Sequence, residues 1–241
     1  MMFDTKMSAC FITHSLCTIA ILTSLFSRVK TTPTGAERWR HPCGISNTDT
    51  SHLPPVPTRP LVEIITGMLV LIKEGQEYSS NLQEKFAMER VQSMRHVALL
   101  NSLHHDGFPN VKTATEGDIQ NSVINVPKTH LDSYRTLAIA LVFIEKMKFD
   151  EDIYENKKYS NDILIMESKL YDILCHMDEV ISTNGDSIEH VTREVMSREL
   201  RAHSERTTRI DRDYITVKDT SKIMDYLIVQ YSALKNHIQE S

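Results

Sequence analysis

Three adjacent side chains, His104, His105 and Asp106, are the first place in this sequence to look for metal chemistry. A protein-bound zinc ion takes three or four ligands at regular spacings, and no further ligand follows these three at such a spacing. Glu199 and His203 would share one helical face, but they form only a pair. We therefore interpret His104, His105 and Asp106 as solvated loop side chains, and no metal site is predicted.

Motifs for catalysis are not found either. The sequence contains no Gly-rich phosphate loop, no G-x-S-x-G, no H-E-x-x-H and no C-x-x-C. No Glu-x-x-His pattern, which di-iron helical bundles use, occurs on any predicted helix. The methionines of the helices are more typical of core packing than of a cofactor site. We predict a protein that is not an enzyme and that needs no cofactor.

Four cysteines allow one disulfide in the mature chain. Cys10 and Cys17 lie in an apolar N-terminal run, which leaves Cys43 and Cys175. These two either pair, which would pin the N-terminal segment to the folded domain, or remain as unpaired thiols. No N-x-[ST] glycosylation signal is present.

Composition excludes several classes of partner. The chain has 241 residues, of which 41% are hydrophobic and 24% charged, with a net charge of -5. Its isoelectric point is near 6.1. An ordinary globular composition with a slightly acidic balance gives no reason to expect nucleic acid or an anionic membrane as partner.

The N-terminal region divides into two parts. Ala9 to Ser27 is apolar, with Lys6 ahead of it and Arg28 behind it, so residues 1–27 are predicted to be a cleaved signal peptide. A membrane anchor and a buried N-terminal helix are the alternatives. Residues 28–59 are rich in Pro, Thr and Ser and are predicted to form an extended tether before a helical domain at residues 60–241.

Four stretches carry apolar residues at the three- and four-residue steps of an amphipathic helix: 60–95, 127–148, 160–181 and 213–241. A bend is plausible at Gly67 or Gly75 in the first stretch. Asn184 and Gly185 are expected to end the third helix. A further short helix is expected near residues 189–200.

The links between the four helices predict the topology. They span about 22, about 11 and about 27 residues, whereas antiparallel neighbours need only about two to eight. A long link lets the chain travel the length of a bundle and begin the next helix in the same direction. The sequence thus predicts an all-α, long-chain four-helix bundle with up-up-down-down topology and two long crossover loops.

Several short stretches resemble one family. The run His130–Leu141, HLDSYRTLAIAL, is similar to the L-x-x-Y-R-T-x-x-x-x-L stretch in the second helix of ciliary neurotrophic factor and its relatives. HHDGFPN, from His104, resembles the Q-G-x-P turn after their first helix, without the Gln. Lys222, Ile223 and Leu227 resemble the start of their last helix. The chain therefore resembles the interleukin-6 family of long-chain helical cytokines.

This resemblance implies a secreted, extracellular cytokine that bridges type I cytokine receptor chains and triggers JAK-STAT signalling. The receptor chains implied are the shared signal-transducing receptor of the interleukin-6 family and a chain like the leukaemia inhibitory factor receptor. After removal of the signal peptide, no membrane contact is implied. A disulfide between Cys43 and Cys175 is also implied, because leukaemia inhibitory factor and oncostatin M join a tether cysteine to the third helix.

The resemblance also points to a receptor contact. The family's F-x-x-K motif near the start of the last helix is absent, and Tyr214 and Val217 stand at its positions, with Lys218 one place on. Tyr214 and Lys218 lie one helical turn apart, so we predict them to be exposed receptor anchors, or else a helix-end packing pair. Two other classes of function stay open: a helical adaptor retained by its N-terminal apolar segment, and an extracellular carrier of an apolar ligand.

Overall fold

The computed structural model describes residues 35–44 and 59–240. The predicted signal peptide, residues 1–27, and most of the predicted tether lie outside these described residues. Within them, the regular secondary structure is entirely helical, which confirms the all-α prediction. No helix in the described part of the chain has the length and apolar character needed to cross a membrane.

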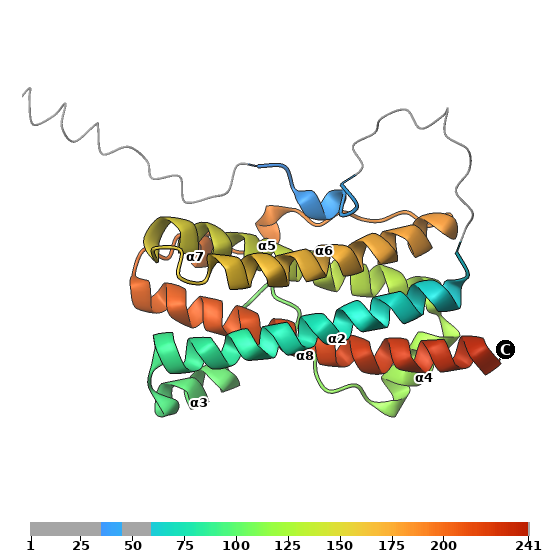
Figure 1. The fold of residues 1–241 in the computed structure, drawn as a ribbon, viewed down its shortest axis with the longest axis horizontal. Coiled ribbons are helices and arrows are strands. Elements are labelled where there is room, and N and C mark those ends of the chain that lie inside the picture. Colours follow the sequence, from blue (N-terminus) through green and yellow to red (C-terminus); the bar gives the residue numbers. More distant parts are fainter. Residues whose placement is uncertain (1–34, 45–58, 241) are drawn as a thin grey trace, which may run out of the picture. The chain divides into compact units, whose positions relative to one another are not determined.

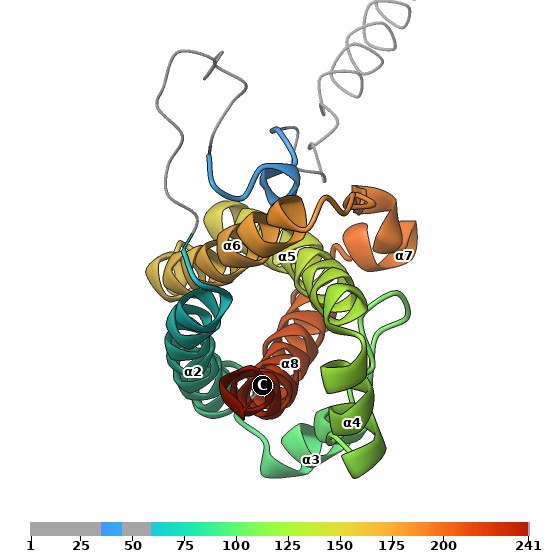
Figure 2. The same cartoon turned by 90° about the vertical axis from the view of Figure 1, so that its right-hand side faces the viewer.

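Four long helices form a bundle (Figures 1 and 2). They are α2 (Leu61–Phe86), α5 (Val126–Tyr154), α6 (Ser160–Thr183) and α8 (Arg206–Glu240). Helix α2 packs against α6 and α8, and α5 packs against the same two helices. The core between them is made of aliphatic and aromatic residues with little or no exposed surface; it includes Ile65, Met68, Ile72, Leu137, Leu141, Ile144, Leu170, Leu174, Met224 and Leu227.

The first predicted helix is divided in two, at a place other than the predicted glycines. Helix α2 continues through both Gly67 and Gly75, and Gly75 lies where an added Cβ would be 3.7 Å from the Met224 sulfur. The chain instead leaves α2 through a π-helical turn, η3 (Ala87–Val91), followed by Gln92 in the left-handed region at φ 57°. A separate helix, α3 (Met94–Ser102), then begins with the Ser93 side chain accepting the His96 N–H.

The second and last helices are longer than predicted. Helix α5 reaches Tyr154, because Asp150 and Glu151 are buried in ion pairs instead of lying in a solvated link. The link to α6 is therefore only residues 155–159. Helix α8 begins at Arg206, and the predicted helix near residues 189–200 is reduced to a 3₁₀ turn, η4 (Arg193–Val195), and one turn of α7 (Arg198–Arg201).

Capping residues define two further helix ends, the start of α4 and the end of α6. The stretch 104–126 shows no sustained period, yet it contains α4 (Glu116–Ile124), which begins at a capping box between Thr115 and Asp118. The third helix ends where predicted, with Asn184 as its C-cap and Gly185 at φ 77°.

Residues 35–44, here called the N-terminal clasp, are held against the bundle. The clasp contains a 3₁₀ turn, η1 (Arg38–Arg40), and the ring of Trp39 has no exposed surface. Trp39 donates its indole N–H to the Val191 carbonyl at 2.8 Å, and its own carbonyl accepts the Tyr134 hydroxyl at 2.6 Å. The prediction of an extended tether with little to bury is therefore wrong for these residues.

The predicted disulfide is present. Cys43 of the clasp is bonded to Cys175 in α6, with Cα atoms 4.9 Å apart. It closes a loop over a sequence separation of 132 residues, which strongly restricts the unfolded chain. The alternative of two unpaired thiols is thereby excluded.

Replacing Trp39 tests whether the clasp stabilises the bundle through packing as well as through the disulfide. We expect Trp39→Ala to reduce the free energy of unfolding by about 3–5 kcal/mol, because it leaves a large cavity and an unpaired Val191 carbonyl. Urea denaturation under non-reducing conditions measures this. The neighbouring Arg38→Ala, an exposed position, serves as control and should change stability by less than about 1 kcal/mol. Equal effects of the two variants would contradict a packing role for Trp39.

Candidate functional site on the final helix

The two histidines considered for metal chemistry contact different parts of α8. His104 Nδ1 lies 3.2 Å from a carboxylate oxygen of Asp219. His105 donates Nε2–H to the Arg212 carbonyl at 3.0 Å and stacks on Phe143. Burial lowers the pKa of His105. Their contacts hold the loop after α3 against α8. No group of three or more His, Cys, Asp or Glu side chains in the described ranges is arranged to hold a metal ion.

Glu199 and His203 do not share a helical face as expected. Helix α7 ends at Arg201, so only Glu199 belongs to it, and Glu199 is exposed. Burial lowers the pKa of the His203 ring, which is partly covered. The pair has no common geometry that could support chemistry.

The predicted receptor anchors, Tyr214 and Lys218, are buried, so the prediction that they are exposed is wrong. Only 1% of the Tyr214 surface and 3% of the Lys218 surface is exposed. The Tyr214 hydroxyl donates to the Asn101 side chain at 2.9 Å and accepts from Gln83 at 3.2 Å. The first contact comes from α3 and the second from α2, so Tyr214 lies between two helices.

Lys218 caps the neighbouring helix α3. Its ammonium group donates to the carbonyls of Leu100 and Leu103, at 3.2 and 2.5 Å. These carbonyls stand at the C-terminal end of α3, where a helix has unpaired acceptors and a partial negative charge. Burial lowers the pKa of Lys218, and the carboxylate of Asp219, 3.3 Å away, opposes that shift. The residue is thus part of the α3–α8 contact.

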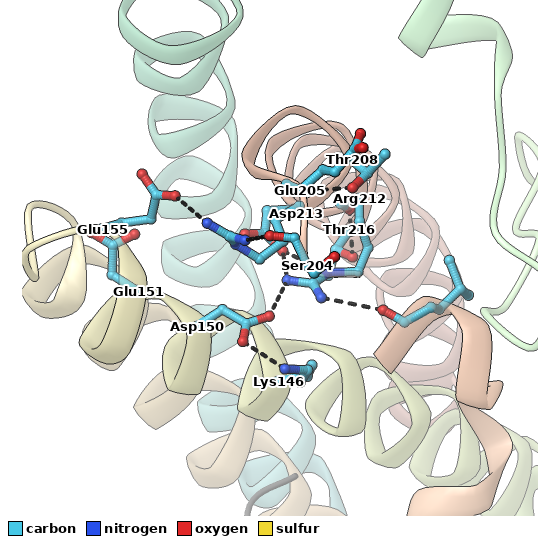
Figure 3. A network of polar contacts seen from close by, with 12 residues as sticks. Lys146, Asp150, Glu151, Glu155, Ser204, Glu205, Thr208, Arg212, Asp213 and Thr216 are labelled. Carbon is cyan, nitrogen blue, oxygen red and sulfur yellow. Dashed lines mark hydrogen bonds and ion pairs between the residues drawn. The ribbon is translucent and has the colours of Figure 1, made fainter. Parts of the chain in front are cut away.

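A buried network of charged side chains lies at the N-terminal end of α8 (Figure 3). The Arg212 guanidinium contacts Asp150 of α5 at 2.8 Å and its neighbour Asp213 at 2.5 Å. Lys146 contacts the other oxygen of Asp150 at 2.5 Å. Arg212 also donates to the Leu200 carbonyl at 3.3 Å. The network thereby joins α5, α8 and the chain around α7.

Burial shifts the pKa values of the charged groups in this network. It raises the pKa of Asp213 to about 6, against the opposing effect of Arg212. It lowers the pKa of Lys146, although Asp150 favours the charged form. For Arg212, the carboxylates of Asp213 and Asp150 outweigh burial and raise the pKa. Sequence reasoning missed this network; Lys146 and Asp150, four residues apart on a helix, were its only local signal.

A groove runs along the outer side of the C-terminal half of α8 and is centred on Tyr226. Three adjoining hollows of about 560, 380 and 400 Å³ share Tyr226 in their walls. The loop at residues 110–114 and Lys222, Asp225 and Val229 of α8 form one part. Helices α4 and α5 form the rest, with Asp118, Asp132 and Gln230. The sequence signal for this groove was Tyr226, an aromatic residue that lies outside the predicted apolar stripe of α8.

Exposed apolar side chains gather in the segment around α3. Met88, Met94, Leu99 and Leu103 expose 68, 81, 53 and 44% of their surface. Val97 and Leu100 of the same helix face inward and are buried. Helix α3 is therefore apolar on both sides, and the outer side is accessible to a partner.

Comparison with protein-family models, with curated proteins and with solved structures found no match to this chain.

Substitutions at the α3–α8 contact test whether Tyr214 and Lys218 support the fold. We expect Lys218→Ala to cost about 1–3 kcal/mol of unfolding free energy, since two buried carbonyls lose a charged donor. Tyr214→Phe should cost about 1 kcal/mol through the lost hydroxyl contacts. Chemical denaturation gives both values. Lys222→Ala, which removes a half-exposed lysine 3.2 Å from Asp219, is the control and should stay below about 1 kcal/mol. A control as costly as Lys218→Ala would contradict the interpretation.

A second prediction concerns acid sensitivity at the contact of α5 with α8, where His130 Nδ1 lies 3.0 Å from the Tyr231 hydroxyl. Burial lowers the pKa of His130 to about 4, whereas the unfolded side chain titrates near 6.5. The unfolded chain therefore binds the proton first, and stability present above about pH 6.5 is lost as the pH falls towards 4, by up to about 3 kcal/mol.

His130→Gln should remove this part of the pH dependence. The measurement is the unfolding free energy of wild type and variant at several pH values between 7 and 4, and only their difference is read. Asp213, whose raised pKa acts with the opposite sign, cancels in that difference. The exposed His41→Gln is the control. A wild-type minus His130→Gln difference that does not change with pH would overturn the prediction.

Proposed function

We propose that this protein is a secreted cytokine that bridges two type I cytokine receptor chains and triggers JAK-STAT signalling. The observation that carries the proposal is the relative direction of the helices that pack against one another. In each of three pairs of neighbouring helices, successive contacts involve rising residue numbers in one helix and falling residue numbers in the other. They are Glu74–Lys169 and Lys85–Asp162 for α2 with α6, Ser80–Ser221 and Gln83–Tyr214 for α2 with α8, and His130–Tyr231 and Asp150–Arg212 for α5 with α8.

This pairing supports the up-up-down-down topology of long-chain cytokines. Helix α2 is antiparallel to α6 and α8, and α5 is antiparallel to α8, so α2 and α5 run in the same direction. Residues 87–125 and 184–205 then act as long crossovers, and the short link 155–159 joins antiparallel neighbours. Bundles that hold cofactors more often use short links throughout.

The disulfide supports the extracellular part of the proposal. Structural disulfides form and persist in oxidising compartments and are rare in the cytosol. The Cys43–Cys175 bond fits a secreted protein better than an adaptor kept inside the cell. A carrier of an apolar ligand would need an enclosed cavity, whereas the hollows of the described residues are lined by surface loops and helix faces.

Bridging two receptor chains requires two separate surfaces, and α8 contributes to both of the surfaces described above. Helix α3, whose outer side is apolar, covers α8 at Tyr214, and the groove is centred on Tyr226. Twelve helical residues correspond to about 18 Å, so two receptor modules can approach without competing for the same side chains. Aromatic and methionine side chains are frequent in such contacts.

Substitutions on the two surfaces test the proposal. Met94→Glu with Leu99→Glu should weaken binding of one receptor chain by at least about tenfold, and Tyr226→Ala should do the same for the other. Each variant should keep its remaining partner and lose receptor-dependent STAT phosphorylation. Binding to the separate ectodomains of the shared signal-transducing receptor and of a leukaemia inhibitory factor receptor-like chain is the measurement.

Val70→Glu on α2 is the matched control, because Val70 and Leu99 are both 53% exposed. It should leave both affinities unchanged. A loss of binding with this control, and not with the α3 variant, would move the contact to the exposed side of α2. Wild-type protein that binds neither ectodomain would overturn the proposed function.

A further inference from the structure

The methionines of the described residues fall into two groups that differ in exposure. One group consists of core residues with at most 1% of their surface exposed: Met68, Met147, Met166, Met177, Met196 and Met224. The other group is Met88 and Met94, which expose 68 and 81% of their surface. Neither of these two belongs to the apolar core or to the partly buried side chains packed against it. No methionine in the described ranges has an intermediate exposure.

The two exposed methionines flank the turn that leads from α2 into α3. Met88 lies in the π-helical turn η3, and Met94 is the first residue of α3. Met88 also lines a hollow of about 330 Å³, whose wall includes the polar side chains of Asn81, Lys85 and Asp162. A small polar solute can therefore reach the Met88 sulfur through this hollow and the Met94 sulfur directly from solvent.

A thioether at such a position reacts with a peroxide. The sulfur lone pair attacks one peroxide oxygen, the O–O bond breaks, and that oxygen is transferred to sulfur while water leaves. Sulfur loses two electrons and hydrogen peroxide gains them, so each peroxide consumed gives one sulfoxide and one water. The product is polar where the thioether was apolar, and sulfoxide reductases can reverse the change.

The fold determines which sulfurs this reaction reaches. The Met224 sulfur lies where α8 packs against Gly75 of α2, so peroxide can reach it only when the bundle opens. Oxidation of Met88 and Met94 places the new oxygens in water. No buried polar group is created, and the core packing is unchanged. The exposed pair can therefore be oxidised while the bundle stays folded.

We propose that Met88 and Met94 are the peroxide-reactive site of this protein and that their oxidation lowers its affinity for the receptor chain bound at α3. The effect on binding rests on the proposed function and adds regulation to it. The exposed apolar side chains around α3 are these two methionines with Leu99 and Leu103. Oxidation makes two of the four polar, and a polar group buried in an apolar contact loses its water without gaining a matched partner.

Peptide mapping after limited treatment with hydrogen peroxide tests the site and needs no receptor. In the full chain, Met88 and Met94 should each be oxidised at least tenfold faster than any of the core methionines. Guanidinium chloride should abolish the difference, because exposure and not the neighbouring sequence causes it. The oxidised protein should keep a thermal midpoint within about 2 °C of the untreated protein. A core methionine oxidised in the folded protein as fast as Met88 or Met94 would overturn the site.

Receptor binding tests the consequence of oxidation. Peroxide should weaken the binding of one receptor chain at least about tenfold in wild type and leave the chain bound at the Tyr226 groove unchanged. Met88→Leu with Met94→Leu is the matched control, since leucine has a similar volume and is not oxidised. This double variant should bind both receptor chains equally well before and after treatment.

The outcomes of this experiment distinguish the oxidation site from the proposed function. An equal loss of binding in wild type and in the double variant would overturn the regulation. Oxidised wild-type protein that binds both chains as before would also overturn it, while the proposed function stands. Untreated protein that binds neither chain, with Met88 and Met94 still oxidised first, would overturn the proposed function and support the oxidation site.

Discussion

The ion pair between Arg212 of α8 and Asp150 of α5 constrains the rest of this structure, because both side chains are almost without exposed surface. An isolated charge in a protein interior is far less stable than the same charge in water, so each member of the network needs its partners in place. Lys146, Asp213 and the Leu200 carbonyl provide them. These groups come from α5, α8 and the chain near α7, so the network forms only when all three have assembled. It therefore joins α8 to α5 through paired charges as well as through the apolar core.

The same requirement for paired polar groups explains the contact between α3 and α8. Lys218 is buried because α3 offers two free carbonyls at its C-terminus, and α3 can end there because Lys218 supplies the donor. Each element completes the hydrogen bonds of the other. Helix α3 also adds Val97 and Leu100 to the apolar core that the four long helices share.

Helix α8 thus unites the two surfaces considered for binding. Its N-terminal half lies under α3, and its C-terminal half forms the floor of the groove around Tyr226. The clasp acts at a distance from both: Trp39 and the Cys43–Cys175 bond attach it to the α6 side of the bundle. These contacts stabilise the bundle on the side formed by α5 and α6.

The amino-acid sequence by itself determined the elements with strong local signals. Apolar periodicity located the four long helices, and Asn184 and Gly185 marked the end of α6. The cysteine count left Cys43 and Cys175 either paired or free, and only the family resemblance implied the bond that the structure contains. The tertiary structure decided which polar residues are buried. Tyr214 and Lys218 were predicted to be exposed and Asp150 to lie in a link, because hydropathy describes a side chain without its partners; all three are buried. The contact of α3 with α8 and the contact of Trp39 with Val191 join residues that are far apart in the sequence. No local sequence pattern could predict them.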